Sequence, residues 1–465
     1  MIKSKWILTV CVCVGFCINP PGTFANSVFS KNAFSKPSVN LDNESRLDFF
    51  LGESFFSRMW VIAPSSTQAS DGLGPLYNAR SCMSCHPNNG RALAPFKHAD
   101  DASMLVARVS IPVQSNNLKL QRIADRVSYV PEPTYGMQMQ YFAIPGHKAE
   151  SRLQVYYKES RITLGDGSVV RLRKPQYDFM QLNYGALHSQ VRISPRVAPQ
   201  LIGLGLLAAI DEQEILSRHD PDDHNADGIS GRVNRVWSQD TKKVQVGRFG
   251  YKASVSSINE QTQSAFSRDL GLSVPYFSDA YGDCTSRQTE CIAAPNGNSP
   301  QYENLEVHQQ VVDLVNTYVS NIDVPEQRRV SKDSVLAGKK LFEQIGCNAC
   351  HTPSYQLTAT TSSEEGRFQS ISPYTDLLLH DMGEGLADHF PEGEASGREW
   401  RTAPLWGIGL TKYVSGQAQF LHDGRARSLI EAILWHGGEA QTHRDKVISL
   451  DRASREQLLT FIESL

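Results

Sequence analysis

The sequence lacks an excess of one charge and is poor in cysteine. Its 465 residues include 46 Lys and Arg against 49 Asp and Glu, which gives a formal net charge of −3. A chain without a global basic field is not expected to bind nucleic acid or an anionic membrane surface. Nine cysteines are too few to stabilise a chain of this length mainly by disulfide bonds, so their spacing matters more than their number.

Apolar runs long enough to cross a membrane are also missing. The run from Trp6 to Ile18 is shorter than the ~20 residues of a membrane span. Lys3 and Lys5 precede it, and a small residue, Ala25, ends the segment. This pattern predicts a signal peptide over residues 1–25, with a retained anchor as the alternative. We therefore expect export to the periplasm and no membrane span in the mature protein.

Four cysteines form two copies of one motif, Cys-x-x-Cys-His. The copies are Cys82-Met-Ser-Cys85-His86 and Cys347-Asn-Ala-Cys350-His351. In c-type haem attachment, two thiols bond to the porphyrin edge and the adjacent imidazole binds the iron. For a single copy, a redox dithiol or half of a zinc site would be the alternative. Two copies in an exported chain predict two covalently bound haem c groups, with His86 and His351 as iron ligands. The remaining pair, Cys284 and Cys291, predicts a local disulfide.

The pattern between the motifs predicts a mainly α fold of two cytochrome c-like haem domains. The first would span residues 26–329, enlarged by long loops and a small β insertion at about 104–200. Within that insertion, alternating residues flank Gly165-Asp-Gly167 and predict a hairpin. The second domain would span residues 330–465. There an apolar stripe before Cys347 should pack on the last helix of the chain.

An acidic loop has the spacing of a partial calcium site. Asp223, Asn225, Asp227 and Gly228 follow the first half of an EF-hand loop, whereas position twelve is Asn234 in place of a bidentate Glu. Calcium binding through Asp223, Asn225 and Asp227 is one interpretation. A turn rich in Asp and Asn that binds nothing is the other.

Several blocks of the sequence resemble the dihaem oxidoreductase, putative peroxidase family, also labelled thiol oxidoreductase-like. They are the segments 72–86, 377–383, 400–409 and 421–440. The family is distantly related to bacterial dihaem cytochrome c peroxidase and to the methylamine-utilisation dihaem enzyme. The resemblance implies two haems, the first reacting with peroxide and the second receiving electrons.

The resemblance also implies ligands for the second haem. In the peroxidases a Met after the block that matches residues 420–424 supplies the sixth ligand, and His436 stands at that place here. We therefore expect a second haem held by His351 and His436, with a lower potential than a Met-ligated haem. Met382 is the rival ligand, and His436 could instead be a polar residue at a helix end.

The resemblance leaves the first haem less well defined. His422 matches a histidine that lies near the first haem in the relatives, so we assign it either a distal role or a role in supporting the residues that contact the haem. Trp400 and Trp406 are either electron relays or core aromatics, and Arg425 either pairs with a haem propionate or is solvated. No distal acid or base is recognisable after His86. Gln138 and Gln140 could hydrogen-bond an iron-bound oxygen species, although an amide transfers protons poorly.

Three functions remain open from the sequence. The first is a haem-dependent, peroxidase-like enzyme that reduces hydrogen peroxide or another small oxidant, with a redox partner protein as electron donor. The second is a non-catalytic dihaem electron-transfer cytochrome, for example one that serves metal uptake. The third is a thiol oxidoreductase. Fold alone does not decide between them.

Overall fold

The computed structural model describes residues 28–113, 118–357 and 370–465, so the predicted signal peptide over residues 1–25 lies outside the described residues. The fold mixes helices with several small sheets, with 30% of the residues in helices and 19% in strands. The prediction of a mainly α fold is therefore wrong. Many of the strands are only two to four residues long. Such strands are too short to produce a period-two pattern in the sequence.

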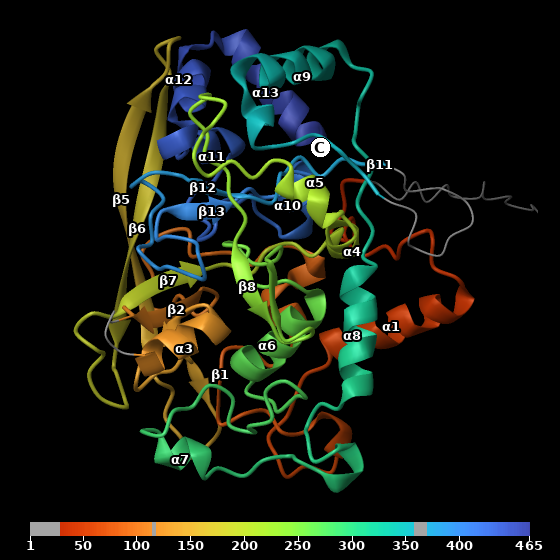
Figure 1. The fold of residues 1–465 in the computed structure, drawn as a ribbon, viewed down its shortest axis with the longest axis vertical. Helices are drawn as coiled ribbons and strands as arrows, with labels where there is room; N and C mark the ends of the chain where they lie inside the picture. The colour runs from red at the N-terminus through yellow and green to blue at the C-terminus, as the bar shows by residue number, and fades with distance from the viewer. Residues whose placement is uncertain (1–27, 114–117, 358–369) are drawn as a thin grey trace, which may run out of the picture.

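The elements follow one another along the chain as shown in Figure 1. The α-helices are α1 (Asn43–Ser57), α2 (Cys82–Cys85), α3 (Leu118–Val127), α4 (Leu204–Ala208), α5 (Glu212–Leu216), α6 (Ile258–Leu270), α7 (Thr289–Ile292), α8 (Gln309–Ser320), α9 (Asp333–Ile345), α10 (Thr411–Val414), α11 (Leu429–Leu434), α12 (Gln441–Ser449) and α13 (Arg452–Ser464). The strands are β1 (Leu76–Tyr77), β2 (Val106–Ile111), β3 (Val130–Pro131), β4 (Phe142–Ala143), β5 (Arg152–Thr163), β6 (Val169–Met180), β7 (Arg192–Arg196), β8 (Arg235–Ser238), β9 (Lys243–Val246), β10 (Tyr355–Gln356), β11 (Ser370–Ile371), β12 (Leu379–Asp381) and β13 (Glu399–Arg401).

The helix before the second motif packs on the last helix of the chain, as the apolar stripe predicted. α9 lies against α13, and Val335 and Phe342 share a buried cluster with Phe461. The crossing is close because residue 338 is glycine. A Cβ at Gly338 would lie 2.0 Å from the carbonyl oxygen of Gln457, so a larger residue would push the helices apart.

A second helix pair, which the sequence analysis did not predict, serves the first motif. α1 packs on α8, and a Cβ at Gly52 would lie 2.0 Å from the carbonyl oxygen of Leu314. Phe56, one turn after that glycine, is buried and contacts Tyr318 of α8 with ring centroids 5.2 Å apart. At both helix crossings a glycine of one helix therefore packs directly against a backbone carbonyl of the other helix.

The two helix pairs also place an aromatic ring beside each motif histidine in the same way. The ring centroid of Phe56 lies 6.2 Å from that of His86, and the ring centroid of Phe342 lies 6.3 Å from that of His351. Both phenylalanines stand four residues after the crossing glycine, so the halves share a Gly-x-x-x-Phe pattern. This repeat in the structure supports a duplicated arrangement around the two motifs.

A long hairpin connects the two halves of the molecule. β5 and β6 pair antiparallel along their whole length, from Arg152↔Met180 to Thr163↔Val169. Figure 1 shows this hairpin running along one side of the molecule towards α12 and α13. At its tip, the Gly165 N–H donates to the Ile448 carbonyl at 2.7 Å, and Arg455 binds the Asp166 carboxylate at 2.5 Å. The predicted hairpin is confirmed.

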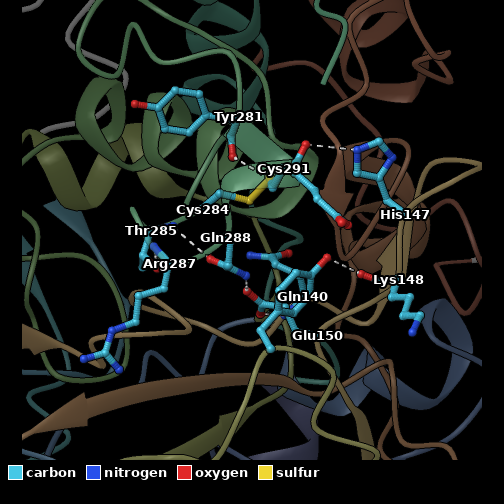
Figure 2. Close-up of a disulfide and its surroundings, with 12 residues drawn as sticks. Gln140, His147, Lys148, Glu150, Tyr281, Cys284, Thr285, Arg287, Gln288 and Cys291 are labelled. Carbon is cyan, nitrogen blue, oxygen red and sulfur yellow. Dashed lines mark hydrogen bonds between the residues drawn. A yellow bond between two sulfur atoms is a disulfide. The ribbon is translucent and has the colours of Figure 1, made fainter. Parts of the chain in front are cut away.

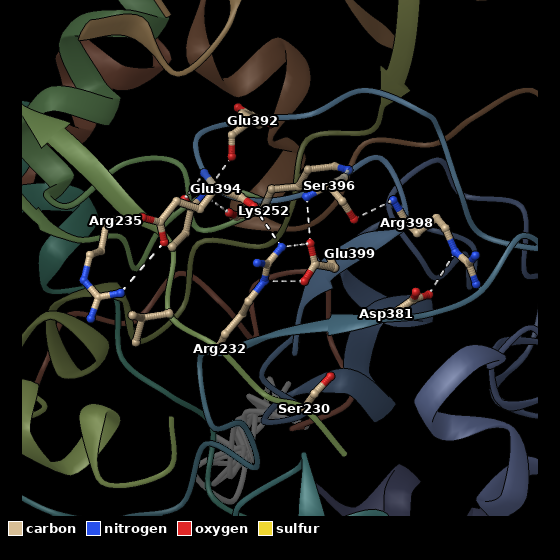
Figure 3. A network of polar contacts seen from close by, with 12 residues as sticks. Ser230, Arg232, Arg235, Lys252, Asp381, Glu392, Glu394, Ser396, Arg398 and Glu399 are labelled. Atoms are coloured by element: carbon tan, nitrogen blue, oxygen red, sulfur yellow. Dashed lines mark hydrogen bonds and ion pairs between the residues drawn. The ribbon is translucent and has the colours of Figure 1, made fainter. Parts of the chain in front are cut away.

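Polar contacts also join residues of the first half to the β12–β13 region, as Figure 3 shows. Arg232 pairs with Glu399, and Lys252, which is fully buried, donates to the Ser396 carbonyl and to Asp388 Oδ1, both at 2.9 Å. These contacts hold the two halves in one orientation. Across the described ranges, no helix has the length and apolar composition needed to cross a bilayer.

Candidate functional site

One cavity inside the molecule brings both motifs together. Its volume is about 500 Å³, within the ~300–1,000 Å³ typical of ligand pockets. Both Cys-x-x-Cys-His segments line it, although they are far apart in the chain. Other residues predicted from the sequence that line the cavity are Gln138, Met382, Trp400, Trp406, His422 and His436.

The two motif histidines are held in one orientation and one tautomer. His86 Nδ1 lies 2.8 Å from the Pro199 carbonyl oxygen, and His351 Nδ1 lies 2.9 Å from the Tyr374 carbonyl oxygen. A carbonyl can only accept, so each Nδ1 carries the proton and each Nε2 keeps its lone pair for a metal. Burial lowers the pKa of both imidazoles to about 4, so both are neutral at pH 7.

His436 has the same arrangement at the second motif. It follows α11, and its Nδ1 donates to the Ala432 carbonyl at 2.8 Å, which leaves Nε2 free. Burial lowers its pKa, and its proximity contributes to the lowered pKa of His351. Met382 lines the same cavity, so both sixth-ligand candidates are present. Of these two candidates, His436 is the one whose orientation is fixed by a hydrogen bond of its side chain.

His422 stacks on Trp400 at the cavity wall. The ring centroids are 3.8 Å apart and the planes are within 10° of each other. Burial lowers the pKa of His422 to about 3, so the imidazole is uncharged. The ammonium of Lys252 lies 4.3 Å from the centroid of Trp400, and Trp400 Nε1 donates to the Leu386 carbonyl at 3.0 Å. Trp400 therefore contacts both a neutral imidazole and a buried cation.

Arg425 is neither solvated nor free for a haem propionate. Its Nη2 lies 2.7 Å from Asp423 Oδ2, and its Nη1 donates to the Gly385 carbonyl at 2.7 Å. Both side chains of this ion pair are buried. The Asp423 carboxylate is the anion that Arg425 binds.

A comparison with protein families shows the family directly. The chain matches the family described as "Di-haem oxidoreductase, putative peroxidase" over residues 22–465. The chain belongs to this family. The resemblance found in the sequence is therefore confirmed, and a pair of haems is the family's cofactor.

Other comparisons add little about this dihaem oxidoreductase family member. Among solved structures, hydrazine synthase from Kuenenia stuttgartiensis is 16% identical, over 44% of this chain and 70% of that chain, with a TM-score of 0.25. A likeness of this size carries no argument about function. No curated protein matches the chain.

The charged lining of the cavity fits the haems of a dihaem oxidoreductase. Arg401 and Arg91 both line it, and among the described residues neither has a carboxylate within ion-pair distance. Arg401 donates to the Gly250 and Thr402 carbonyls at 2.9 and 3.2 Å, and Arg91 Nε is buried without a hydrogen-bond partner. Arg91 also donates from Nη2 to the Leu421 carbonyl, so both guanidinium groups are partly buried and bonded to carbonyls, with no neutralising anion in the described part of the chain. Carboxylate substituents such as haem propionates would supply the missing anions.

The two predicted glutamines occupy different places. Gln138 lines the cavity, and its Nε2 donates to the Arg268 carbonyl at 2.8 Å and to Asp269 Oδ1 at 2.7 Å. Gln140 is not among the cavity-lining residues, and its Nε2 also donates to the Arg268 carbonyl at 2.8 Å. Both amide hydrogens of Gln138 are thus used within the protein.

Asp269 is a cavity residue that the sequence analysis missed. It is the penultimate residue of α6 and is the hydrogen-bond partner of Gln138 at the first motif. Burial raises the pKa of this carboxyl. In the sequence it is an acidic residue near the end of an amphipathic helix, far from the motif cysteines, so no pattern marks it as part of the site.

The acidic loop binds its own backbone. Asp223 Oδ1 accepts from the Asp227 N–H at 3.0 Å, and Asp227 Oδ1 accepts from the Ile229 N–H at 2.9 Å. Asn234, at position twelve of the compared loop, is fully buried and donates to the Lys252 and Glu392 carbonyls. These are contacts of a turn rich in Asp and Asn. Calcium binding by this loop stays a prediction.

Proposed function

We propose that this dihaem oxidoreductase family member is an exported c-type enzyme that reduces hydrogen peroxide or a similar small oxidant. In this proposal one haem is attached through Cys82 and Cys85 with His86 as iron ligand. The other is attached through Cys347 and Cys350 with His351 as ligand. The oxidant is reduced at the first haem, and electrons enter through the second from a redox partner protein. Export to the periplasm would follow from the signal peptide.

The observation that carries the proposal is the shared cavity. Both motifs line it, and each presents a neutral imidazole whose Nδ1 proton is held by a backbone carbonyl. A held imidazole needs little reorganisation to bind iron, and its carbonyl partner increases the basicity of Nε2. Haem iron would supply the redox change and a position for the oxidant.

The second haem is assigned two histidine ligands, His351 and His436. The His436 Nε2 is free because Nδ1 is bound to the Ala432 carbonyl. Replacement of a Met ligand by imidazole lowers the potential of a haem. This haem would accept electrons from a correspondingly low-potential donor, which makes it suited to a relay role.

The haem count of matured protein tests the attachment sites. Protein produced with a c-type maturation system should contain two haems per chain by pyridine haemochrome assay, still bound after denaturation. C82A/C85A and C347A/C350A should each lose one. The matched control is C284S/C291S, since these cysteines form the disulfide of the structure and should leave both haems in place. A colourless wild-type chain would refute the proposal.

Peroxide consumption tests the activity. With an artificial reductant, wild-type protein should consume peroxide catalytically, and C82A/C85A should not. If both irons are low-spin and neither responds to peroxide, the protein is an electron-transfer cytochrome and the enzymatic proposal is wrong.

A further inference from the structure

Asp269 brings a carboxyl group to the first-motif end of the cavity. Its Oδ1 accepts the hydrogen bond from Gln138 Nε2 at 2.7 Å. Its Oδ2 has no hydrogen-bond partner among the described residues, and the residue lines the cavity. One oxygen is thus held in place while the other is available to a molecule in the cavity.

The surroundings of Asp269 contain charges of both signs. Burial raises its pKa, while Arg108 of β2 and Arg268 of α6 act in the opposite direction. Asp269 lines the same cavity as Cys82, Cys85 and His86 of the first motif, so its charge faces the space beside that motif. Burial favours the protonated form of this carboxyl, whereas Arg108 and Arg268 favour the carboxylate, so the group can act both as a proton acceptor and as a proton donor.

Gln138, the hydrogen-bond partner of Asp269, is held in place by the loop that the Cys284–Cys291 disulfide closes, here called the disulfide loop. Asp283 Oδ2 accepts from the backbone N–H groups of Met137 and Gln138 at 2.5 and 3.0 Å. Asp283 is next to Cys284 of the disulfide, and its pKa is raised to about 6, mainly by burial. The loop therefore holds the backbone of Gln138, and through it the position of the Asp269 carboxyl.

A second set of contacts anchors the same segment, as Figure 2 shows. Gln288, from the disulfide loop, donates to Glu150 Oε1 at 2.5 Å, and the Gln140 N–H donates to Glu150 Oε2 at 2.7 Å. The segment that carries Gln138 is thus bound on both sides of that residue. A firmly held first oxygen leaves Asp269 Oδ2 at a defined place on the cavity wall.

We propose that Asp269 is the proton-transfer group of the first haem site, an assignment that rests on the proposed function. The carboxylate takes the proton from one peroxide oxygen, and the resulting acid returns it to the other oxygen as the O–O bond breaks. Overall, one hydrogen peroxide, two electrons from the reduced partner protein and two protons from solvent give two water molecules. Gln138 and Asp283 act as positioning residues, because they reach the chemistry only through Asp269.

The variant D269N tests this assignment with little change of structure. The Asn amide oxygen can still accept from Gln138 Nε2, but the side chain can no longer transfer a proton. General acid–base catalysis typically contributes ~10²–10⁴-fold, so peroxide turnover should fall by that factor. Unchanged turnover at an unchanged haem count would overturn the assignment.

Cyanide binding to the ferric protein gives a readout that is independent of turnover. Hydrogen cyanide must lose its proton to bind, so we expect D269N to slow association at least about tenfold, as for loss of a catalytic base. D269E should recover part of the rate. The matched control is E306Q, which changes a buried carboxyl that does not line the cavity. A D269N rate within twofold of wild type would refute the assignment.

The two assays separate the assignment from the proposed function. If cyanide binding depends on Asp269 but wild-type protein does not reduce peroxide, the proposed function fails and the proton-transfer role stands. If D269N reduces peroxide normally, the function stands and the assignment fails. If D269N loses a haem, the assignment is tested instead by the pH dependence of the cyanide association rate in the wild-type protein. A rate governed by a group titrating above the ordinary aspartate range supports Asp269, and a pH-independent rate overturns it.

Discussion

The close crossing of α9 and α13 leads to a quantitative prediction for G338A. A Cβ at this position would lie 2.0 Å from the carbonyl oxygen of Gln457 and 2.7 Å from the Cβ of Phe461. Non-bonded carbon and oxygen atoms rarely approach closer than ~3.3 Å, so the helices must separate by more than about 1 Å. The nearest obstacle is backbone, which cannot rotate away as a flexible side chain could.

The expected loss of stability combines two opposing terms. Overpacking typically costs ~1–3 kcal/mol, and the rigid obstacle at Gly338 places this site near the upper end. Replacement of a helical glycine by alanine returns about 1 kcal/mol of helix propensity. The net loss in the free energy of unfolding should be about 2 kcal/mol.

Denaturant unfolding followed by far-ultraviolet circular dichroism measures this loss. The matched control is G385A, because a Cβ at Gly385 would meet Trp435 at an ordinary contact distance of 3.6 Å. G52A should behave like G338A, since its Cβ would meet the Leu314 carbonyl oxygen at the same 2.0 Å. If G338A were as stable as wild type while G385A is also unchanged, the close crossing would not exist in solution.

Three further predictions concern the site and its surroundings. H436M should raise the reduction potential of the second haem, because a thioether replaces an imidazole, and a spectroelectrochemical titration would show an unchanged potential if His436 is not the ligand. The folded pKa of His422 lies far below its ordinary value of 6.5, so between about pH 6.5 and 3 the unfolded chain binds more protons and stability falls as the pH falls. H422Q should reduce that slope by up to about 1.4 kcal/mol per pH unit, and equal slopes in urea titrations of both proteins would contradict the buried neutral imidazole. D423N leaves Arg425 buried without its counter-ion and should cost ~3–5 kcal/mol in denaturant unfolding at pH 7. The control is E456Q in the exposed Arg452–Glu456 pair, which should lower the free energy of unfolding by ~1 kcal/mol or less. Similar losses of stability in D423N and E456Q would contradict the burial of the Asp423–Arg425 pair.

The local parts of the site could be predicted from the sequence, because local chemistry determines them. A Cys-x-x-Cys-His segment places two thiols and an imidazole in one turn whatever the rest of the chain does. The stripe containing Val335 and Phe342 required a helical partner, and the structure supplies α13. The hairpin at Gly165 followed from alternating residues around a turn. Each of these signals lies within one continuous stretch of the chain.

Features that depend on distant segments escaped prediction. The Gly-x-x-x-Phe repeat at Gly52 and Gly338 is too short to stand out until the helix crossings show what the glycines permit. Asp269 reaches the cavity only because α6 packs beside the first motif. Arg425 was expected to be solvated or bound to a propionate, but folding places Asp423 against it in a buried pair. The fold class was wrong because short strand pairs leave no periodic signal.

Electron transfer between the haems tests the central claim most directly. In rapid mixing, protein whose second haem has been reduced beforehand would be exposed to peroxide while the spectra of both haems are followed. A single cavity shared by both motifs predicts that the second haem is oxidised in wild type but stays reduced, or is oxidised far more slowly, in C82A/C85A. A second haem that is oxidised at the same rate with and without the first haem would contradict the account.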